Sequence, residues 1–410
     1  MKNIAINTVL FVTVMFVALL VVDALFIQYE KRFLKQNIYE VDGTYNLHSL
    51  HYNDTTVTAK KPAGEFRALS LGDSFTEGIT RYEYSYTQVI AKTVNDHYSD
   101  HLFRAVNVGE SATGLMDYQK AYKYWSERID HDAVIVNVYL GNDIAFLERH
   151  RPWTLQPVMT AHNYDLVDGR RRTLIPQKYP LRIFDYIYAY ASQRHMPDQL
   201  NIEIDDSRYK QSAYFQMDEG KFHEKGYETL EKTFRVDGQA NLVEGYRDLA
   251  QLFRTLDKVR AEGKSVLITL GTFEAQAEDG FRADLLARFA ANPEDYDILL
   301  PARIIEAIRQ RVSPKLSVLD LTPWFRCRAA KGDDLYFQNN THYSVAGDAV
   351  HGIVAGQQIL AKWFGKQLSL PPEIAECEDW ADPYLQRPAS KTDAEIDAFI
   401  NTVISSGTND

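Results

Sequence analysis

From residue 66 onward, short apolar runs alternate with amphipathic helical stretches, and this pattern constrains the fold more than any other feature. The strand candidates are Arg67–Leu71, Phe103–Val108, Ala133–Leu140, Ser265–Leu270 and Leu316–Leu321. The helical stretches between and after them are Tyr86–Tyr98, Leu115–Ile129, Leu242–Ala261 and Ser344–Trp363. Strands that are apolar along their whole length need cover on both faces. The alternation therefore predicts an α/β fold with a mostly parallel sheet between helices.

The first 30 residues carry the strongest apolar run of the chain. The stretch Ile4–Ile27 has 24 residues with only four polar interruptions. As a helix it would be about 36 Å long, enough for the hydrocarbon core of a bilayer. We predict a single transmembrane anchor at residues 1–30; a cleavable signal peptide is the rival, although no clean A-x-A site follows the run. One lysine precedes the run and three basic residues follow it, which favours a cytoplasmic C-terminal side.

The same pattern indicates one domain with attachments, although 410 residues would allow two or three domains. The domain is predicted at residues 66–366, and residues 31–65 form a polar connector to the anchor. An insertion at about 150–239 breaks the strand–helix rhythm. The last residues, 367–410, read as an acidic, partly helical tail.

The insertion contains a hairpin signal and many aromatic residues. Asp168-Gly169 separates Tyr164–Val167 from Arg170–Arg172, which is the sequence pattern of a tight β-hairpin. We expect the insertion to pack against or over a functional site. Two interpretations of the three arginines stay open: contact with an anionic polysaccharide, or a solvated hairpin face.

Charge and cysteine usage exclude several classes of protein. The net charge of −11 argues against nucleic acid as a partner, because phosphate binding needs clustered positive charge. The chain has no H-E-x-x-H motif, no clustered Cys/His spacing and no phosphate-binding loop, so neither a metal nor a cofactor is predicted. Its two cysteines, Cys327 and Cys377, could form one bridge outside the cytosol. The sequence leaves open whether they meet.

Four short polar blocks follow predicted strands, where ligands of open parallel sheets bind. They are centred on Ser74, Gly109, Asn142 and His342. A serine at a strand-to-helix turn is an exposed nucleophile, and nearby helix amides favour a developing negative charge. Thr76 stands where an α/β-hydrolase elbow, G-x-S-x-G, has its last glycine, so that signature is absent.

These blocks, Gly72-Asp73-Ser74-Phe75, N-x-G ending at Gly109, Leu140-Gly141-Asn142-Asp143 and His342, resemble the SGNH (GDSL-type) hydrolase family in content and order. The resemblance covers about 66–149 and 240–366, roughly half of the chain. It implies a three-layer α/β/α fold with a five-stranded, flavodoxin-like parallel sheet. It also implies that Ser74 is the nucleophile and His342 the base. The implied oxyanion hole is made by the N–H groups of Ser74 and Gly109 and by the Asn142 side chain.

One position departs from the family pattern. The family has an aspartate three residues before the histidine, and here that position is Asn339, followed by a second asparagine. A neutral amide can orient the imidazole but cannot stabilise imidazolium by charge. Three explanations stay open. Ser74 and His342 act as a dyad whose ring is oriented by a backbone carbonyl or by Asn339, another acid substitutes, or the site is weakened. The substitute acids nearest in sequence are Asp320, Asp333 and Asp334.

The sequence therefore predicts a membrane-anchored serine esterase or acyl-transfer enzyme. An acyl group, expected to be acetyl, would pass through Ser74 to water or to a hydroxyl of an envelope glycan or lipid. The resemblance favours an extracytoplasmic (periplasmic) catalytic domain, against the charge count around the anchor. The alternative is a catalytically weakened SGNH-fold protein for carbohydrate binding or assembly. The sequence indicates no particular protein partner.

Overall fold

The computed structural model describes most of the chain from residue 53 on, and less of what precedes it. The described residues are 10–11, 13–25, 28, 40–47, 53–111, 113–145, 165–167, 170–172, 199–200, 206–210, 216–367, 369–378, 380, 382, 384 and 389–405. Among these residues we find no helix that is long and apolar enough to cross a membrane. The anchor predicted at 1–30 lies partly outside the described residues and stays a prediction.

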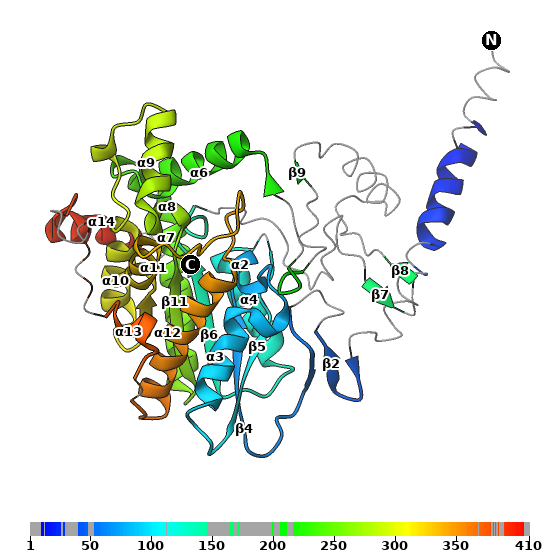
Figure 1. Ribbon diagram of the computed structural model, residues 1–410. Helices are drawn as coiled ribbons and strands as arrows, with labels where there is room; N and C mark the ends of the chain where they lie inside the picture. The colour runs from blue at the N-terminus through cyan, green and yellow to red at the C-terminus, as the bar shows by residue number, and fades with distance from the viewer. Residues whose placement is uncertain are drawn as a thin grey trace, which may run out of the picture.

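A five-stranded parallel sheet forms the centre of the molecule (Figure 1). Its strand order is β12-β11-β6-β4-β5. The bounds are β4 Glu65–Leu71, β5 Leu102–Asn107, β6 Ala133–Tyr139, β11 Ser265–Gly271 and β12 Ser317–Asp320. The most apolar predicted strand, β6, takes the middle position and is buried at all seven of its residues. All five predicted strands are confirmed, together with the predicted sheet type.

Helices cover both faces of this sheet, as the α/β/α expectation requires. On one face, α3 (Tyr86–Asn95) packs against α12 (Val345–Trp363). The other face carries α4 (Leu115–Ser126), α7 (Val243–Ala261) and α10 (Leu300–Val312). The α3–α12 pair is close because glycines of α12 face it: a Cβ on Gly352 would lie 2.4 Å from Val89 Cβ. These helices exclude water from both faces of the sheet.

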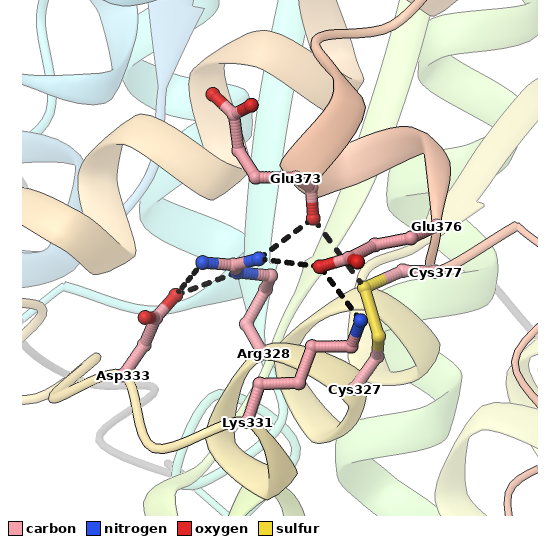
Figure 2. Close-up of a disulfide and its surroundings, with 7 residues drawn as sticks. All are labelled: Cys327, Arg328, Lys331, Asp333, Glu373, Glu376 and Cys377. Atoms are coloured by element: carbon pink, nitrogen blue, oxygen red, sulfur yellow. Dashed lines mark hydrogen bonds and ion pairs between the residues drawn. A yellow bond between two sulfur atoms is a disulfide. The ribbon is translucent and has the colours of Figure 1, made fainter.

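Shorter elements surround the layers. They are α2 (Ser74–Glu77), η2 (Tyr82–Tyr84), α6 (Glu219–Thr233), η4 (Asp237–Leu242), α8 (Glu274–Ala277), α9 (Asp279–Arg288), η5 (Pro293–Asp295), α11 (Thr322–Ala330), α13 (Pro372–Ala375) and α14 (Asp393–Ser405). A disulfide joins Cys327 of α11 to Cys377 after α13, with 5.7 Å between the Cα atoms (Figure 2). Beside it, Arg328 donates to Asp333 Oδ2 at 2.6 Å and to Glu376 Oε1 at 3.1 Å. The tail is thus fastened to the domain.

The predicted connector, 31–65, contains more structure than its polar composition suggests. It holds a three-stranded antiparallel sheet of β1 (Glu40–Val41), β2 (Thr44–Asn46) and β3 (Thr56–Thr58). The Tyr45 ring packs edge-on against Trp125 of α4, with 5.7 Å between centroids. The buried Asp54 accepts a hydrogen bond of 2.6 Å from the N–H of Asn107. This small sheet therefore adds to the core of the domain.

Only parts of the predicted insertion, 150–239, lie within the described residues. The predicted hairpin is confirmed: β7 (Asp165–Val167) pairs antiparallel with β8 (Arg170–Arg172). A second pair joins β9 (Gln199–Leu200) to β10 (Gln216–Met217). The aromatic run that we expected over the site lies outside the described residues.

Candidate active site

Ser74 lies at the first position of α2, directly after the carboxyl end of β4. The buried Asp73 caps this short helix, because its Oδ1 accepts a hydrogen bond of 3.0 Å from the N–H of Phe75. The first N–H groups of a helix have no carbonyl partner within the helix. The structure thus places the predicted nucleophile in a partly exposed turn beside amides of the kind that stabilise an oxyanion.

Gly109 lies in the neighbouring loop, after β5, and it is pressed against α2. A Cβ at this position would lie 2.4 Å from Thr76 Cβ, so only glycine allows this approach. Its N–H, expected in the oxyanion hole, already donates to Asn107 Oδ1 at 3.0 Å. Asn107 Nδ2 in turn donates to the carbonyl of Thr76 at 2.7 Å. The expected Gly109 donor is therefore occupied by a bond that fastens the loop to α2.

Asn142 follows β6 at the same edge of the sheet and is exposed. The next residue, Asp143, is only 1% exposed and holds the turn in place. Its Oδ2 accepts hydrogen bonds from Tyr118 Oη at 2.7 Å and from the N–H of Tyr139 at 2.9 Å. A buried anchor thus fixes the backbone of the turn, and the exposed Asn142 amide can donate to an oxyanion.

His342 lies in the loop that precedes α12, and an asparagine contacts its ring. The Nδ1 atom is 2.6 Å from Asn340 Oδ1, which also accepts the N–H of His342 at 3.0 Å. The expected orienter, Asn339, is not the residue in this contact. Asn339 has φ +51°, and its carbonyl accepts the N–H of Met217 at 3.0 Å. Because of this turn, Asn340 and not Asn339 is hydrogen bonded to the histidine ring.

The loops bring His342 to the neighbourhood of Ser74. The imidazole stacks on Phe75, the residue after the nucleophile, with 4.9 Å between ring centroids. Within the described part of the chain, no hydrogen bond joins Ser74 Oγ to His342 Nε2. Such bonds often tighten only when a substrate is bound, so the arrangement is compatible with a serine–histidine pair.

None of the three acids considered as substitutes for the missing aspartate is hydrogen bonded to the His342 ring in the described structure. Asp320 Oδ1 accepts the N–H of Thr322 at 2.9 Å, and Asp333 pairs with Arg328. The carbonyl of Asp334 accepts Ser344 Oγ at 2.6 Å. Among the described residues, only Asn340 is hydrogen bonded to the His342 ring, through its Oδ1 atom.

The surroundings of His342 favour its neutral form. Burial, together with the smaller effects of the nearby cations Lys225 and Lys210, lowers the pKa of His342 to about 3. With Asn340 Oδ1 as acceptor, the proton of the neutral ring belongs on Nδ1, which leaves the Nε2 lone pair to act as a base. An amide rather than a carboxylate is enough to select this tautomer.

Two buried carboxyl groups, Asp73 and Asp143, lie beneath the site, and the sequence did not single them out. Burial raises the pKa of Asp73 to about 7. Burial also raises the pKa of Asp143, and the charge of Asp73 raises it further. Asp73 Oδ2 and Asp143 Oδ1 are both buried without a hydrogen-bond partner in the described structure. Two such neighbours cannot both ionise cheaply, so the pair keeps a proton at neutral pH. The sequence signal that could have identified them is their position, because Asp73 precedes Ser74 and Asp143 follows Asn142 in the four blocks.

Comparisons with known proteins do not assign this chain to a family. No family model and no curated protein matches the sequence. Similar solved structures include a lipolytic protein of the G-D-S-L family from Veillonella parvula, with 12% identity and a TM-score of 0.33, covering 72% of this chain and 99% of that one. Axe2, an acetylxylan esterase from Geobacillus stearothermophilus, has 14% identity and a TM-score of 0.33, covering 74% and 95%. TesA has 13% identity and a TM-score of 0.33, covering 72% and 98%. Scores this low carry no argument about substrate or mechanism.

Proposed function

We propose that the chain is a serine esterase or acyl-transfer enzyme that forms an acyl-enzyme at Ser74. The observation that carries this proposal is the position of His342. Its ring stacks on Phe75 beside the nucleophile, and its Nδ1 is hydrogen bonded to Asn340. A neutral imidazole with a free Nε2 next to a serine at a strand-to-helix turn is the arrangement needed for nucleophilic catalysis.

In the proposed reaction, Ser74 Oγ attacks the ester carbonyl and its proton passes to His342 Nε2. The oxyanion receives hydrogen bonds from the Ser74 N–H and the Asn142 side chain. Collapse of the tetrahedral intermediate breaks the ester bond, and His342 returns the proton to the departing alkoxide. Water or a second hydroxyl then attacks the acyl-enzyme with His342 again as base, which gives hydrolysis or transfer.

The amide of Asn340 supports a second candidate, a weakened protein that binds a carbohydrate or serves in assembly. Asn340 orients the ring but gives no negative charge to stabilise imidazolium. We favour the enzyme because Ser74 and Asn142 follow the carboxyl ends of the neighbouring strands β4 and β6, and the His342 ring stacks on Phe75, next to Ser74.

We further propose an envelope glycan or lipid as the acyl carrier, a domain outside the cytoplasm and an anchor at residues 1–30. The Cys327–Cys377 disulfide supports this location, since disulfides persist in oxidising compartments. A fusion of alkaline phosphatase to residue 410 tests it. The fusion should be active in cells, and an inactive but stable fusion would contradict the location.

The enzyme proposal is tested with p-nitrophenyl acetate and a fluorophosphonate probe on the chain without the predicted anchor at residues 1–30. Ser74 should be labelled, and Ser74→Ala should abolish both labelling and turnover. His342→Gln should strongly reduce both, because the serine then lacks a base. If turnover is the same in Ser74→Ala and no label is found on Ser74, the protein is not a serine esterase and the binding candidate takes its place.

A further inference from the structure

Lys210 lies at the edge of the candidate site and is held there by its backbone. Its N–H donates to the carbonyl of Ile79 at 3.0 Å, in the loop that follows α2. The preceding residue, Tyr209, packs on Phe337 with 5.4 Å between ring centroids, and its Oη accepts the N–H of Val345 at 3.3 Å. Lys210 therefore sits between the nucleophile loop and the histidine loop.

The side chain of Lys210 is partly buried, and no ion pair joins it to another of the described residues. Burial lowers the pKa of its ammonium group, while Glu77 and Asp348 act in the opposite direction. Both carboxylates have other partners: Glu77 Oε2 accepts the N–H of Ser111 at 3.0 Å, and Asp348 Oδ2 accepts Thr80 Oγ1 at 2.6 Å. Within the described residues neither forms an ion pair with Lys210.

A second cation approaches from α6, in the same insertion. Met217, just before α6, donates its N–H to the carbonyl of Asn339, which fixes this helix beside the histidine loop. Lys225 lies two turns into α6 and is exposed. Its positive charge lowers the pKa of His342, as does the charge of Lys210. Two cations thus act electrostatically on His342, and both come from the part of the chain that the family resemblance does not cover.

We propose that Lys210, with Lys225, binds an anionic group, a carboxylate or a phosphate, of the ester substrate next to His342. This inference rests on the proposed function and gives its substrate class: acyl esters on an acidic carrier such as a uronate or sugar-phosphate unit. A bound anion supplies the counter-charge that Lys210 lacks, and the resulting charge-assisted bond is strong because the site is partly closed to water. It also offsets the cations that oppose protonation of His342, so the base is strengthened when the right substrate is present.

The test compares three matched acetyl esters: methyl glucoside as the neutral case, methyl glucuronide for the carboxylate and methyl glucoside 6-phosphate for the phosphate. In wild-type protein, kcat/KM should be about tenfold or more higher for at least one anionic ester than for the neutral one, mainly through KM. The preference should shrink in 0.5 M NaCl, because salt screens exposed charges. The two anionic esters distinguish a uronate carrier from a sugar-phosphate carrier.

Lys210→Gln should remove most of this preference, and Lys210→Arg should keep it. Lys232→Gln is the control for loss of a lysine charge, since Lys232 lies on α6 like Lys225 but is paired with Glu228. Equal kcat/KM for all three esters in wild type, or an unchanged preference in Lys210→Gln, overturns the inference. If no ester is hydrolysed, the proposed function fails instead. Calorimetric titration with the three unacetylated glycosides then tests the anion site by itself, and no preference for an anionic glycoside rejects it.

Discussion

At the scale of single residues, Asn340 is the hydrogen-bond partner of the His342 ring. Its Oδ1 accepts both the backbone N–H and the Nδ1–H of the histidine, so the ring is oriented without a negative charge. Asn340→Asp has nearly the same shape and adds that charge. In serine proteases the reverse change costs about 10⁴ in turnover. We expect kcat for p-nitrophenyl acetate to rise about 100-fold or more, measured by initial rates.

The neighbouring asparagine is the control for this prediction. Asn339 differs from Asn340 in that its side chain is not the one bonded to Nδ1, and aspartate tolerates its left-handed backbone. Asn339→Asp should therefore leave kcat within about twofold of wild type. If Asn340→Asp leaves kcat unchanged, stabilisation of imidazolium does not limit turnover, and a dyad is sufficient.

The buried pair Asp73 and Asp143 predicts a loss of stability at high pH. The pKa of Asp73 is raised from 3.8 to about 7, so the folded state holds its proton more tightly than the unfolded state. The stabilising contribution is complete below pH 4 and is lost as the pH rises through 7. It amounts to roughly 4 kcal/mol at most. The free energy of unfolding from urea titrations should therefore fall between pH 5 and pH 8.

Asp143→Asn isolates this effect. The amide oxygen can still accept Tyr118 Oη and the Tyr139 N–H, while its NH₂ takes the place of the unpartnered Oδ1. We expect this variant to lose less stability between pH 5 and pH 8 than wild type, because the Asp143 carboxyl no longer titrates while the buried Asp73 still does. The exposed control Asp100→Asn should keep the wild-type dependence. Identical pH dependence in wild type and Asp143→Asn would show that the pair does not share a proton.

At the scale of elements, the fit between α2 and the loop after β5 positions Ser74, the proposed nucleophile. In Gly109→Ala the added methyl meets Thr76 Cβ at 2.4 Å and Glu77 N at 2.7 Å, so α2 must move. Such overpacking costs about 1–3 kcal/mol. A displacement of the nucleophile by about 1 Å costs roughly 100-fold in rate. We expect kcat/KM to fall about 100-fold while the protein stays folded by circular dichroism.

Gly280→Ala on α9 is the matched control, because nothing lies within 4 Å of its Cβ position. Alanine is favoured in a helix, so this variant should be as stable as wild type or more stable. Equal activity of the two variants would mean that the contact between α2 and the loop does not position Ser74.

The elements that could be predicted from sequence are those with a strong local pattern. β6 and β11 are mostly apolar runs, and the Asp168-Gly169 turn marks its hairpin. The choice between Asn339 and Asn340 could not be predicted, because it depends on one residue with positive φ in a loop. Lys210 had no local signal either. Its position depends on pairing with Ile79, about 130 residues earlier in the chain.

At the scale of the whole molecule, the Cys327–Cys377 disulfide closes a 50-residue loop that contains both the histidine loop and α12. Closing a loop of that length stabilises the folded state by about 4 kcal/mol in the chain-entropy model, less any strain. The double variant Cys327→Ala/Cys377→Ala should therefore unfold at lower urea concentration than wild type. The expected loss is a few kcal/mol.

Reduction offers an independent measurement of the same quantity. Wild-type protein in excess reductant should approach the urea midpoint of the double variant, which itself should not respond to reductant. The ion pairs of Arg328 and Lys331 with Glu376 keep α11 and the end of α13 together in both forms. For that reason we expect kcat at 25 °C to change less than twofold. Equal urea midpoints with and without reductant would show that these ion pairs and the core hold the tail without the disulfide. A large loss of kcat in the folded double variant would instead show that the bridge acts on the position of His342.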